Sequence, residues 1–371
     1  MNSRTLSKCL TSISSALVLS AVAAFSHAQE IKIGFYPGAV MTIPSWIALA
    51  KGFYAAEGLD AKLIPAASGP VMSSNVASGA IDVGYNSPSN VGLTRERGFE
   101  QQIVLGNMLM PIVILARSDV STPNLGNYPK SIADMKGLNW GSYGRGSDIE
   151  NIMRVMARDA GLDPDKDVTW IGVGPPPTGL PAMQAKRIEV YGTTMPASEV
   201  AVSAGYGKIL VDLRKGEGPA DFRGAVYSVL LASAERVKKD PALFQKLVAA
   251  HKRTYCWLKD PKNFDEASQL IKSQMPVASM RDSEYLDLVR NAIALVTVKY
   301  PPAGLGVWNK VMVSGGILKE TMPATVVWSQ TPIEDPWSCP GKWCRKSLSS
   351  SSVLPLGLLP TLRPAPAPPA A

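Results

Sequence analysis

The hydrophobic pattern of residues 31–90 repeats one unit three times. In each unit, a short apolar run typical of a strand leads to a small polar residue, one spacer and a proline, and a helical pattern follows. The three junctions are 42–44 (Thr-Ile-Pro), 68–70 (Ser-Gly-Pro) and 86–88 (Asn-Ser-Pro). Ser, Thr or Asn at an N-cap accepts hydrogen bonds from free backbone N–H groups, and proline suits the first helical turn. We therefore expect several helix N-termini at one edge of a mostly parallel sheet, where an anionic or polar small molecule can bind.

The same alternation of strand and helix patterns continues to residue 116 and then starts again after a short capped helix at 131–137. It predicts an α/β architecture, because strands that alternate with helices build sheets covered by helices. The first series has expected strands at 31–36, 60–64, 81–85, 103–107 and 111–116 and helices at 44–57, 70–78 and 88–97. The second series has expected strands at 138–143, 168–173, 188–191 and 208–213 and helices at 148–160 and 179–185, with another starting at 196.

A weak similarity between two segments of the chain suggests two lobes of similar build that face each other. Ile81-Asp82-Val83 before Asn86-Ser87-Pro88 resembles Ile188-Glu189-Val190 before Thr194-Met195-Pro196. A further apolar strand is expected at 225–232, and the chain then turns helical, at 241–258, 264–275, 283–298 and 305–318. These last helices are expected to cover the first lobe after the chain crosses back.

The start of the chain reads as a secretory signal peptide, residues 1–28. Arg4 and Lys8 precede a short apolar run at 16–25, and Ser26-His27-Ala28 fits a small-x-small cleavage site. No later run is long and apolar enough to suggest a membrane span. The expected organisation is therefore a signal peptide (1–28), lobe I (29–116), lobe II (117–224), a return to lobe I with a helical C-terminal part (225–336), and a tail rich in Ser, Pro and Ala (337–371) that we expect to be disordered.

The formal net charge of +8 does not indicate a nucleic-acid partner. Two of the cations leave with the signal peptide, and four more lie in the tail, which has no acidic residue. Residues 29–336 therefore carry only +2, without a cluster of basic and aromatic residues. Cys256 is expected to be a buried, inert thiol within a helix, whereas Cys339 and Cys344 either pair in an oxidising compartment or stay free.

Two sequence blocks carry a family resemblance. The run from Trp46 through Ala48, Ala50 and Lys51-Gly52-Phe53-Tyr54 to Glu57-Gly58-Leu59, followed by residues 79–84 (Gly-Ala-Ile-Asp-Val-Gly), resembles the solute-binding proteins of ABC importers in the nitrate/sulfonate/taurine and thiamine-precursor group. The resemblance covers residues 31–330. It implies the type II periplasmic-binding-protein fold: two α/β lobes, each a mostly parallel sheet flanked by helices, joined by two crossover strands and closing on a ligand in the cleft. Lys186 and Glu189 stand where relatives usually have Gly and Asp, which leaves the ligand open.

Arg145 is the most distinctive candidate for ligand contact. It lies at a strand-to-helix junction between two glycines, where a guanidinium can hold a carboxylate or sulfonate in two-point geometry; the alternative is a solvated loop residue. The three first-lobe junctions contain no Asp or Glu, which a cationic ligand would need, so an anionic or neutral ligand is expected. The other candidates, each of which alternatively caps its own helix or packs in the core, are Thr42, Ser45, Trp46, Ser68, Asn86, Ser87, Ser147 and Thr194.

Catalysis is not expected, because the chain lacks a GxSxG motif and any metal-type pairing of Cys and His, and His251 is the single histidine after the signal peptide. We expect no catalytic residues, metal or cofactor. The resemblance implies a monomeric periplasmic component of an ABC importer that captures a small organic anion, of sulfonate or aromatic carboxylate type, by hinge closure and delivers it to an inner-membrane permease. Three alternatives stay open: binding of a neutral pyrimidine-type thiamine precursor through Asn86 and aromatic stacking, an exported enzyme on the same fold, and a sensor subunit.

Overall fold

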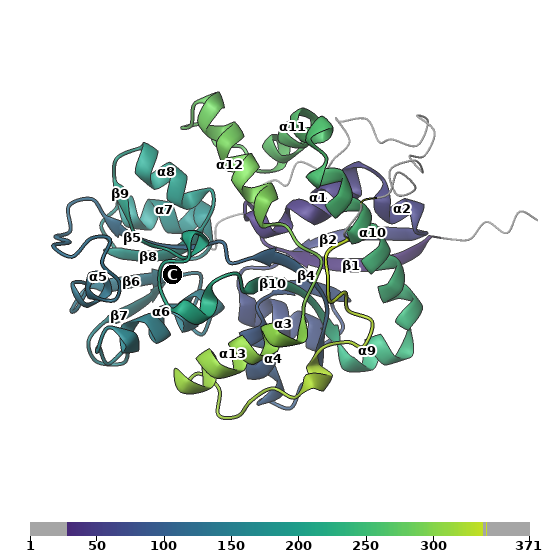
Figure 1. Cartoon of the computed structure of the whole chain (residues 1–371), viewed down its shortest axis with the longest axis horizontal. Helices are drawn as coiled ribbons and strands as arrows, with labels where there is room; N and C mark the ends of the chain where they lie inside the picture. The colour runs from purple at the N-terminus through teal and green to yellow at the C-terminus, as the bar shows by residue number, and fades with distance from the viewer. Residues whose placement is uncertain (1–27, 337–338, 340–371) are drawn as a thin grey trace, which may run out of the picture.

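The computed structural model describes residues 28–336 and Cys339 of the chain. The expected signal peptide and, apart from Cys339, the tail after residue 336 lie outside the described residues. Two five-stranded sheets form the centres of two lobes that lie side by side (Figure 1), with strand orders β2-β1-β3-β10-β4 and β7-β6-β8-β5-β9. The two-lobed α/β prediction is confirmed.

The first lobe contains both ends of the described chain. Helices α1, α2 and α10 lie on one side of its sheet and α3 and α4 on the other (Figure 1). Its strands are β1 (Gln29–Phe35), β2 (Leu59–Pro65), β3 (Val83–Asn86), β4 (Gln101–Leu109) and β10 (Val226–Ser233). Its helices are α1 (Ile43–Ala50), α2 (Phe53–Ala56), α3 (Gly69–Ala77), α4 (Pro88–Arg95), α9 (Ala234–Lys239), α10 (Pro241–Lys259), α11 (Phe264–Gln274), α12 (Asp282–Leu295) and α13 (Pro302–Ser314).

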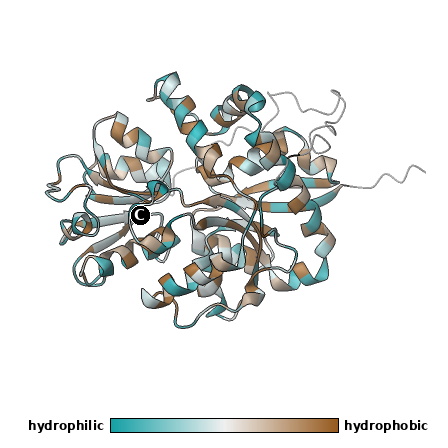
Figure 2. Ribbon diagram, in the orientation of Figure 1, coloured by the Kyte–Doolittle hydropathy of each residue, from teal (hydrophilic) through white to brown (hydrophobic). Residues whose placement is uncertain are grey.

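The second lobe is built from the middle of the chain. Helices α7 and α8 cover one side of its sheet and α6 the other (Figure 1). Its strands are β5 (Ile112–Arg117), β6 (Asn139–Ser142), β7 (Thr169–Gly172), β8 (Val190–Thr194) and β9 (Gly207–Asp212). Its helices are α5 (Lys130–Ala133), α6 (Asp148–Asp159), α7 (Pro176–Gln184) and α8 (Ala197–Ser203). Apolar residues gather on the strands and on the inward helix faces of both lobes (Figure 2).

Both sheets are mixed rather than mostly parallel. In the first, β1 pairs in parallel with β2 and β3, whereas β10 pairs antiparallel with β3 and β4. In the second, β6 pairs in parallel with β7 and β8, whereas β5 pairs antiparallel with β8 and β9. The antiparallel strands β10 and β5 are the ones that follow the two crossings between lobes. The chain enters each sheet at the end where the neighbouring parallel strands finish, as the pairing of Ile112 with Thr194 shows.

The first crossing lies earlier than the sequence analysis placed it. Residues 112–116 were expected in lobe I, but β5 belongs to the second sheet, so the chain crosses at Met110 and Pro111. Residues 112–116 are entirely buried. An apolar run of this kind suits the interior of either sheet, and its pattern does not tell which one.

Glycine and capping explain two other differences. The expected helix 44–57 is divided because Gly52 adopts a left-handed conformation, with φ of 68°, between α1 and α2. Ser68 and Ser147 cap α3 and α6 as expected, accepting hydrogen bonds from the N–H groups of Val71 and Glu150. Thr42 and Ser87 occupy N-cap positions but make no side-chain cap hydrogen bond.

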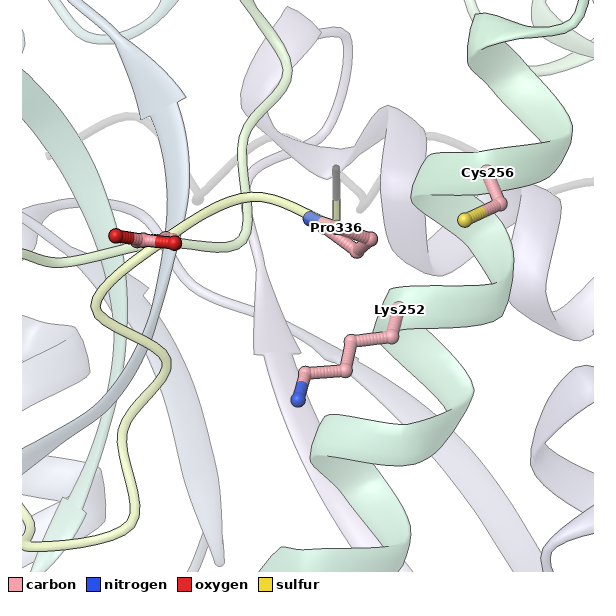
Figure 3. Close-up of a pocket in the computed structure, with 4 residues that line it drawn as sticks. Lys252, Cys256 and Pro336 are labelled. Atoms are coloured by element: carbon pink, nitrogen blue, oxygen red, sulfur yellow. The ribbon is translucent and has the colours of Figure 1, made fainter. Parts of the chain in front are cut away.

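The prediction that Cys256 is an inert thiol is wrong. Cys256 forms a disulfide with Cys339, which lies 83 positions further along the sequence, and the two Cα atoms are 5.2 Å apart. The chain reaches this position because its last described segment returns along the first lobe, where Trp328 donates its N–H to Ile103 O and Tyr300 donates to Pro332 O. Beside the disulfide, a cavity of about 180 Å³ lies between α10 and this segment; Figure 3 shows Lys252 and Cys256 on α10 facing Pro336.

Candidate functional site: the interlobe cleft

Strand ends of both lobes converge on one small cavity. In the first lobe, Tyr36 follows β1 and Asn86 ends β3; in the second, Tyr143 follows β6. Ligands of open α/β sheets bind outside the carboxyl ends of parallel strands, which is where these residues lie. The cavity leaves about 10 Å³ for a water-sized molecule and is lined by Tyr36, Met41, Gly69, Asn86, Tyr143, Asp148 and Tyr227.

Asp148 is the one carboxylic acid in this lining. It is the first residue of α6, it is 8% exposed, and its carboxylate accepts a hydrogen bond from the Tyr227 hydroxyl of β10. Burial raises the pKa of Asp148, while the bond from Tyr227 and the backbone N–H groups at the start of α6 act in the opposite direction. Because Asp148 belongs to the second lobe and Tyr227 to the first, this bond spans the cleft.

The three tyrosines of the cavity differ in their hydrogen bonding. The hydroxyl of Tyr143 stays within its own lobe, 3.0 Å from Thr194 Oγ1, and burial raises the pKa of Tyr143 to about 12. Burial and, after it, the nearby Asp148 raise the pKa of Tyr36. Within the described residues, the Tyr36 hydroxyl has no hydrogen-bond partner, although Tyr36 is only 5% exposed. All three phenols are therefore neutral at physiological pH.

Loops of the two lobes touch at two further points. A Cβ atom added to Gly144, after β6, would lie 3.5 Å from the Cβ of Ser68, before α3. One added to Gly38, after β1, would lie 3.5 Å from Cγ of Pro177, at the start of α7. Both distances are ordinary van der Waals contacts, so the two lobes lie close to each other at these loops.

Most of the polar residues expected to bind ligand are already used inside their own lobe. Ser45 is fully buried; its hydroxyl lies 2.8 Å from the Tyr54 hydroxyl and 2.6 Å from that of Tyr85. Tyr54 in turn lies 3.0 Å from Nε2 of His251. This chain of hydrogen bonds runs through the core of the first lobe.

Asn86 is the only expected site residue that also lines the cavity. Its amide nitrogen donates to Gly69 O at 3.0 Å and to Ser73 Oγ at 2.9 Å. Its oxygen accepts from the N–H of Ser87 and from Asn90 Nδ2. The amide therefore has all its usual partners and fixes the junctions before α3 and α4 rather than pointing a free group at a ligand.

The other candidates hold similar internal positions. The Thr42 hydroxyl donates to Tyr36 O at 3.2 Å, and Ser87 Oγ lies 2.7 Å from Ser89 Oγ. Thr194 lies beside the cleft, where its Oγ1 meets the Tyr143 hydroxyl. Trp46 is 5% exposed and belongs to the hydrophobic core of α1. A direct ligand contact by these residues stays a prediction.

Arg145 does not line the cavity. Its side chain is 57% exposed, and its Nη1 lies 3.4 Å from Oε1 of Glu150, a side chain that is 2% exposed. Glu150 Oε1 also accepts a hydrogen bond from Nε of Arg154, at 3.0 Å. The guanidinium therefore has an acidic partner on α6, and reaching a ligand would require it to leave that partner.

Three residues of the cavity are not recognisable from the sequence pattern: Asp148, Tyr143 and Tyr227. Asp148 directly follows the cap Ser147, but there it is indistinguishable from an ordinary acidic residue in a first helical turn. The first-lobe junctions contain no acidic residue, but this does not describe the whole cleft, because the carboxylate of Asp148 enters it from the second lobe. Tyr227 is 79 positions away from Asp148 in sequence, a separation that no local pattern bridges.

Among the residues that the structure describes, no group of three or more His, Cys, Asp or Glu side chains is placed to hold a metal ion. No described helix combines the length and apolar character needed to cross a membrane.

Two lobes that meet at a cleft lined from both sides define a periplasmic-binding-protein fold. The chain belongs to the NMT1-like family, whose model matches residues 26–272. Among curated proteins it is 33% identical over 101 residues to a UPF0065 protein of Bordetella pertussis strain Tohama I; the match covers 27% of this chain and 30% of that relative.

Solved structures share the fold at low sequence identity. A protein of Bordetella bronchiseptica RB50 has a TM-score of 0.68 at 21% identity, covering 82% of this chain and 95% of that one. The alkanesulfonate-binding protein SsuA of Xanthomonas axonopodis pv. citri, bound to MOPS, has a TM-score of 0.64 at 15% identity, with 81% and 98% covered. The periplasmic nitrate-binding protein NrtA of Synechocystis PCC 6803 has a TM-score of 0.64 at 17% identity, with 80% and 84% covered.

Proposed function

We propose that this protein is the periplasmic solute-binding component of an ABC importer. Membership of the NMT1-like family, a fold shared with alkanesulfonate- and nitrate-binding proteins, and an N-terminal sequence typical of a signal peptide all support this role. The protein captures a small molecule between its lobes as a monomer, and an inner-membrane permease receives the closed form. Hinge closure of this kind needs side chains from both lobes at one site, as the cavity lining provides.

The chemistry of the cavity bears on the ligand's charge. The sequence favoured a sulfonate or aromatic carboxylate held by Arg145. A sulfonate would agree with the alkanesulfonate-binding protein SsuA, which shares the fold. A ligand at the cavity, however, meets Asp148 and three phenols, and none of the lining residues is basic. An anion beside a buried carboxylate is repelled strongly, because the surroundings screen charge poorly.

We therefore favour the second ligand class, an uncharged polar molecule such as a pyrimidine-type thiamine precursor. The observation that carries this choice is the buried Asp148 among Tyr36, Tyr143 and Tyr227. Aromatic side chains offer flat apolar surfaces to a heteroaromatic ring, and an acid offers a hydrogen-bond acceptor to its amino or hydroxyl groups. Asn86, the group first expected to make this contact, instead supports the cavity wall.

Binding without chemical conversion agrees with the state of His251. Its side chain is 2% exposed, its Nε2 lies 3.0 Å from the Tyr54 hydroxyl, and burial lowers its pKa to about 3. A histidine this deep in the first lobe is out of reach of a molecule in the cleft, so it is unsuited to act there as a general base. A sensor subunit would use the same binding site, and a neighbouring permease gene distinguishes transport from sensing.

A thermal-shift screen of the mature protein tests the proposal. The panel contains alkanesulfonates, aromatic carboxylates, nitrate and pyrimidines, and each is tested on wild type, Asp148→Asn and Arg145→Ala. A ligand that binds only the folded state raises the melting temperature, the more so the further its concentration exceeds Kd. We expect a pyrimidine-type ligand to raise it in wild type and in Arg145→Ala and to do so less in Asp148→Asn.

The opposite pattern identifies the anion class. If a sulfonate or carboxylate raises the melting temperature of wild type but not of Arg145→Ala, the uncharged ligand is refuted and binding of an anion by Arg145 is supported. If no compound of the panel raises the melting temperature of protein that melts cooperatively, the protein does not bind these classes of compound.

A further inference from the structure

One hydrogen bond joins the lobes directly at the cleft. The hydroxyl of Tyr227, on β10 of the first lobe, donates to Oδ2 of Asp148, at the start of α6 in the second. Tyr227 is 2% exposed and Asp148 8% exposed, so the bond is shielded from water. A hydrogen bond to a charged acceptor in such surroundings is stronger than an ordinary one.

Both partners are held in place by their own lobes. Tyr227 lies near the start of β10, where that strand pairs with β4, and its ring lies 6.3 Å from that of Trp308 on α13. Asp148 is fixed at the first turn of α6, which Ser147 caps. Because Tyr227 and Asp148 belong to different lobes, an opening that moves α6 away from β10 breaks this bond.

Asp148 also faces a phenol that has no partner. Tyr36 lines the same cavity and interacts electrostatically with Asp148, and its hydroxyl has no hydrogen bond within the described residues. The third phenol, that of Tyr143, is already bonded to Thr194 in its own lobe. The polar groups turned towards the cavity are therefore an acid that accepts and a Tyr36 hydroxyl that is free to donate or accept.

We propose that Asp148 and Tyr227 form a latch between the lobes, and that Asp148 determines specificity by requiring a hydrogen-bond donor on the ligand. The latch holds the lobes closed when no ligand is bound, and in that form the cavity has only about 10 Å³ free. A ligand therefore enters when the lobes separate and the bond between Tyr227 and Asp148 breaks, and its N–H or O–H group then replaces the Tyr227 hydroxyl as the donor to Asp148. Tyr36 completes the contact from the first lobe. The ligand half of this inference rests on the proposed function; the latch half does not.

Interlobe distances test the latch without any ligand. Spin labels are attached to cysteines introduced at Phe99 in the first lobe and Val202 on α8 in the second, both exposed, in a Cys344→Ser background that keeps the Cys256–Cys339 disulfide. Double electron–electron resonance then reports the distribution of distances. Tyr227→Phe removes the donor but keeps the ring, and Tyr143→Phe, which removes a phenol bonded within one lobe, is the matched control.

We expect Tyr227→Phe to shift the ratio of short to long distances towards long by roughly 10- to 100-fold, the effect of losing one hydrogen bond to a charged group. Asp148→Ala should do the same, whereas Asp148→Asn keeps an oxygen acceptor and should retain the short distance. Tyr143→Phe should match wild type. If Tyr227→Phe leaves the distribution unchanged, or Tyr143→Phe shifts it equally, the latch is refuted.

Ligand specificity is tested separately by the melting temperature. Donor-bearing uncharged compounds should raise the melting temperature of Asp148→Asn less than that of wild type, and the same compounds with the donor methylated should raise neither. Equal shifts in both proteins would refute the role of Asp148 in specificity. If no compound binds, the proposed function fails while the distance measurements still decide the latch.

Discussion

Removing the disulfide between Cys256 and Cys339 should weaken the fold by an amount that follows from the size of the loop it closes. Cys339→Ser is the cleaner change, because Cys339 is exposed whereas Cys256 is 3% exposed on α10. The bond closes a loop of 83 residues. The chain-entropy relation for such a loop gives about 4.5 kcal/mol at 25 °C, and measured losses for native disulfides are typically about 2–4 kcal/mol.

The stabilisation arises mainly in the unfolded chain, whose ends the bond keeps together. Calorimetry of the oxidised mature protein should therefore show Cys339→Ser melting roughly 5–15 °C below wild type, at roughly 2–4 °C per kcal/mol. Dithiothreitol should lower the melting temperature of wild type to that of the variant and leave the variant unchanged. Cys344→Ser is the control and should melt like wild type.

Equal melting of wild type and Cys339→Ser under oxidising conditions, with no effect of dithiothreitol on either, would contradict the reasoning. It would mean either that the pair does not form in solution or that the segment after residue 328 is anchored without it. Mass spectrometry of a peptic digest separates these two explanations, since only the first lacks the linked peptide.

Three further predictions concern single residues of the first lobe. Burial lowers the pKa of His251 to about 3, so below pH 6.5 the unfolded chain binds a proton that the folded chain does not. The free energy of unfolding should therefore fall by up to about 1.4 kcal/mol per pH unit as the pH drops from 6.5 towards 3. Urea titrations at pH 6.5 and 5.0 should show a smaller fall for His251→Gln than for wild type. Gly106→Ala should destabilise strongly, because its Cβ would lie 1.9 Å from Lys299 O, whereas Gly306→Ala, on α13 with open space around it, should be neutral or stabilise by about 0.5–1 kcal/mol in the same titration. Asn86→Ala should lower the free energy of unfolding by roughly 1–3 kcal/mol, because Ser73 Oγ and Gly69 O lose a buried partner. An unchanged urea midpoint would show that these hydrogen bonds of the Asn86 amide do not stabilise the fold.

The local pattern of the chain predicted the elements well. Glycine ends the first helices and polar residues precede the next, and these signals act within a few residues, so α3, α4, α6 and α10 appear close to their expected bounds. Where the pattern failed, the deciding contacts were distant. The buried run of β5 suits either sheet, and only its pairing with β8 and β9 assigns it to the second lobe.

The cleft was harder to predict than the fold for the same reason. Candidate residues such as Ser45 and Asn86 were recognised by their position after a strand, but their bonding to Tyr85 and Ser73 is tertiary. Asp148 acquires its meaning only when Tyr227 of the other lobe faces it. A pattern that marks helix starts identifies the edge of the sheet where a ligand binds, not which side chains there remain free.

A crystal structure of the mature protein with the best ligand from the thermal-shift panel decides whether Asp148 binds the ligand. We expect the molecule between the lobes, with an N–H or O–H donor within about 3.2 Å of the Asp148 carboxyl group and the hydroxyl of Tyr36 in contact with it. A ligand outside the cleft, or one whose sulfonate or carboxylate is held by Arg145 away from Asp148, would contradict it.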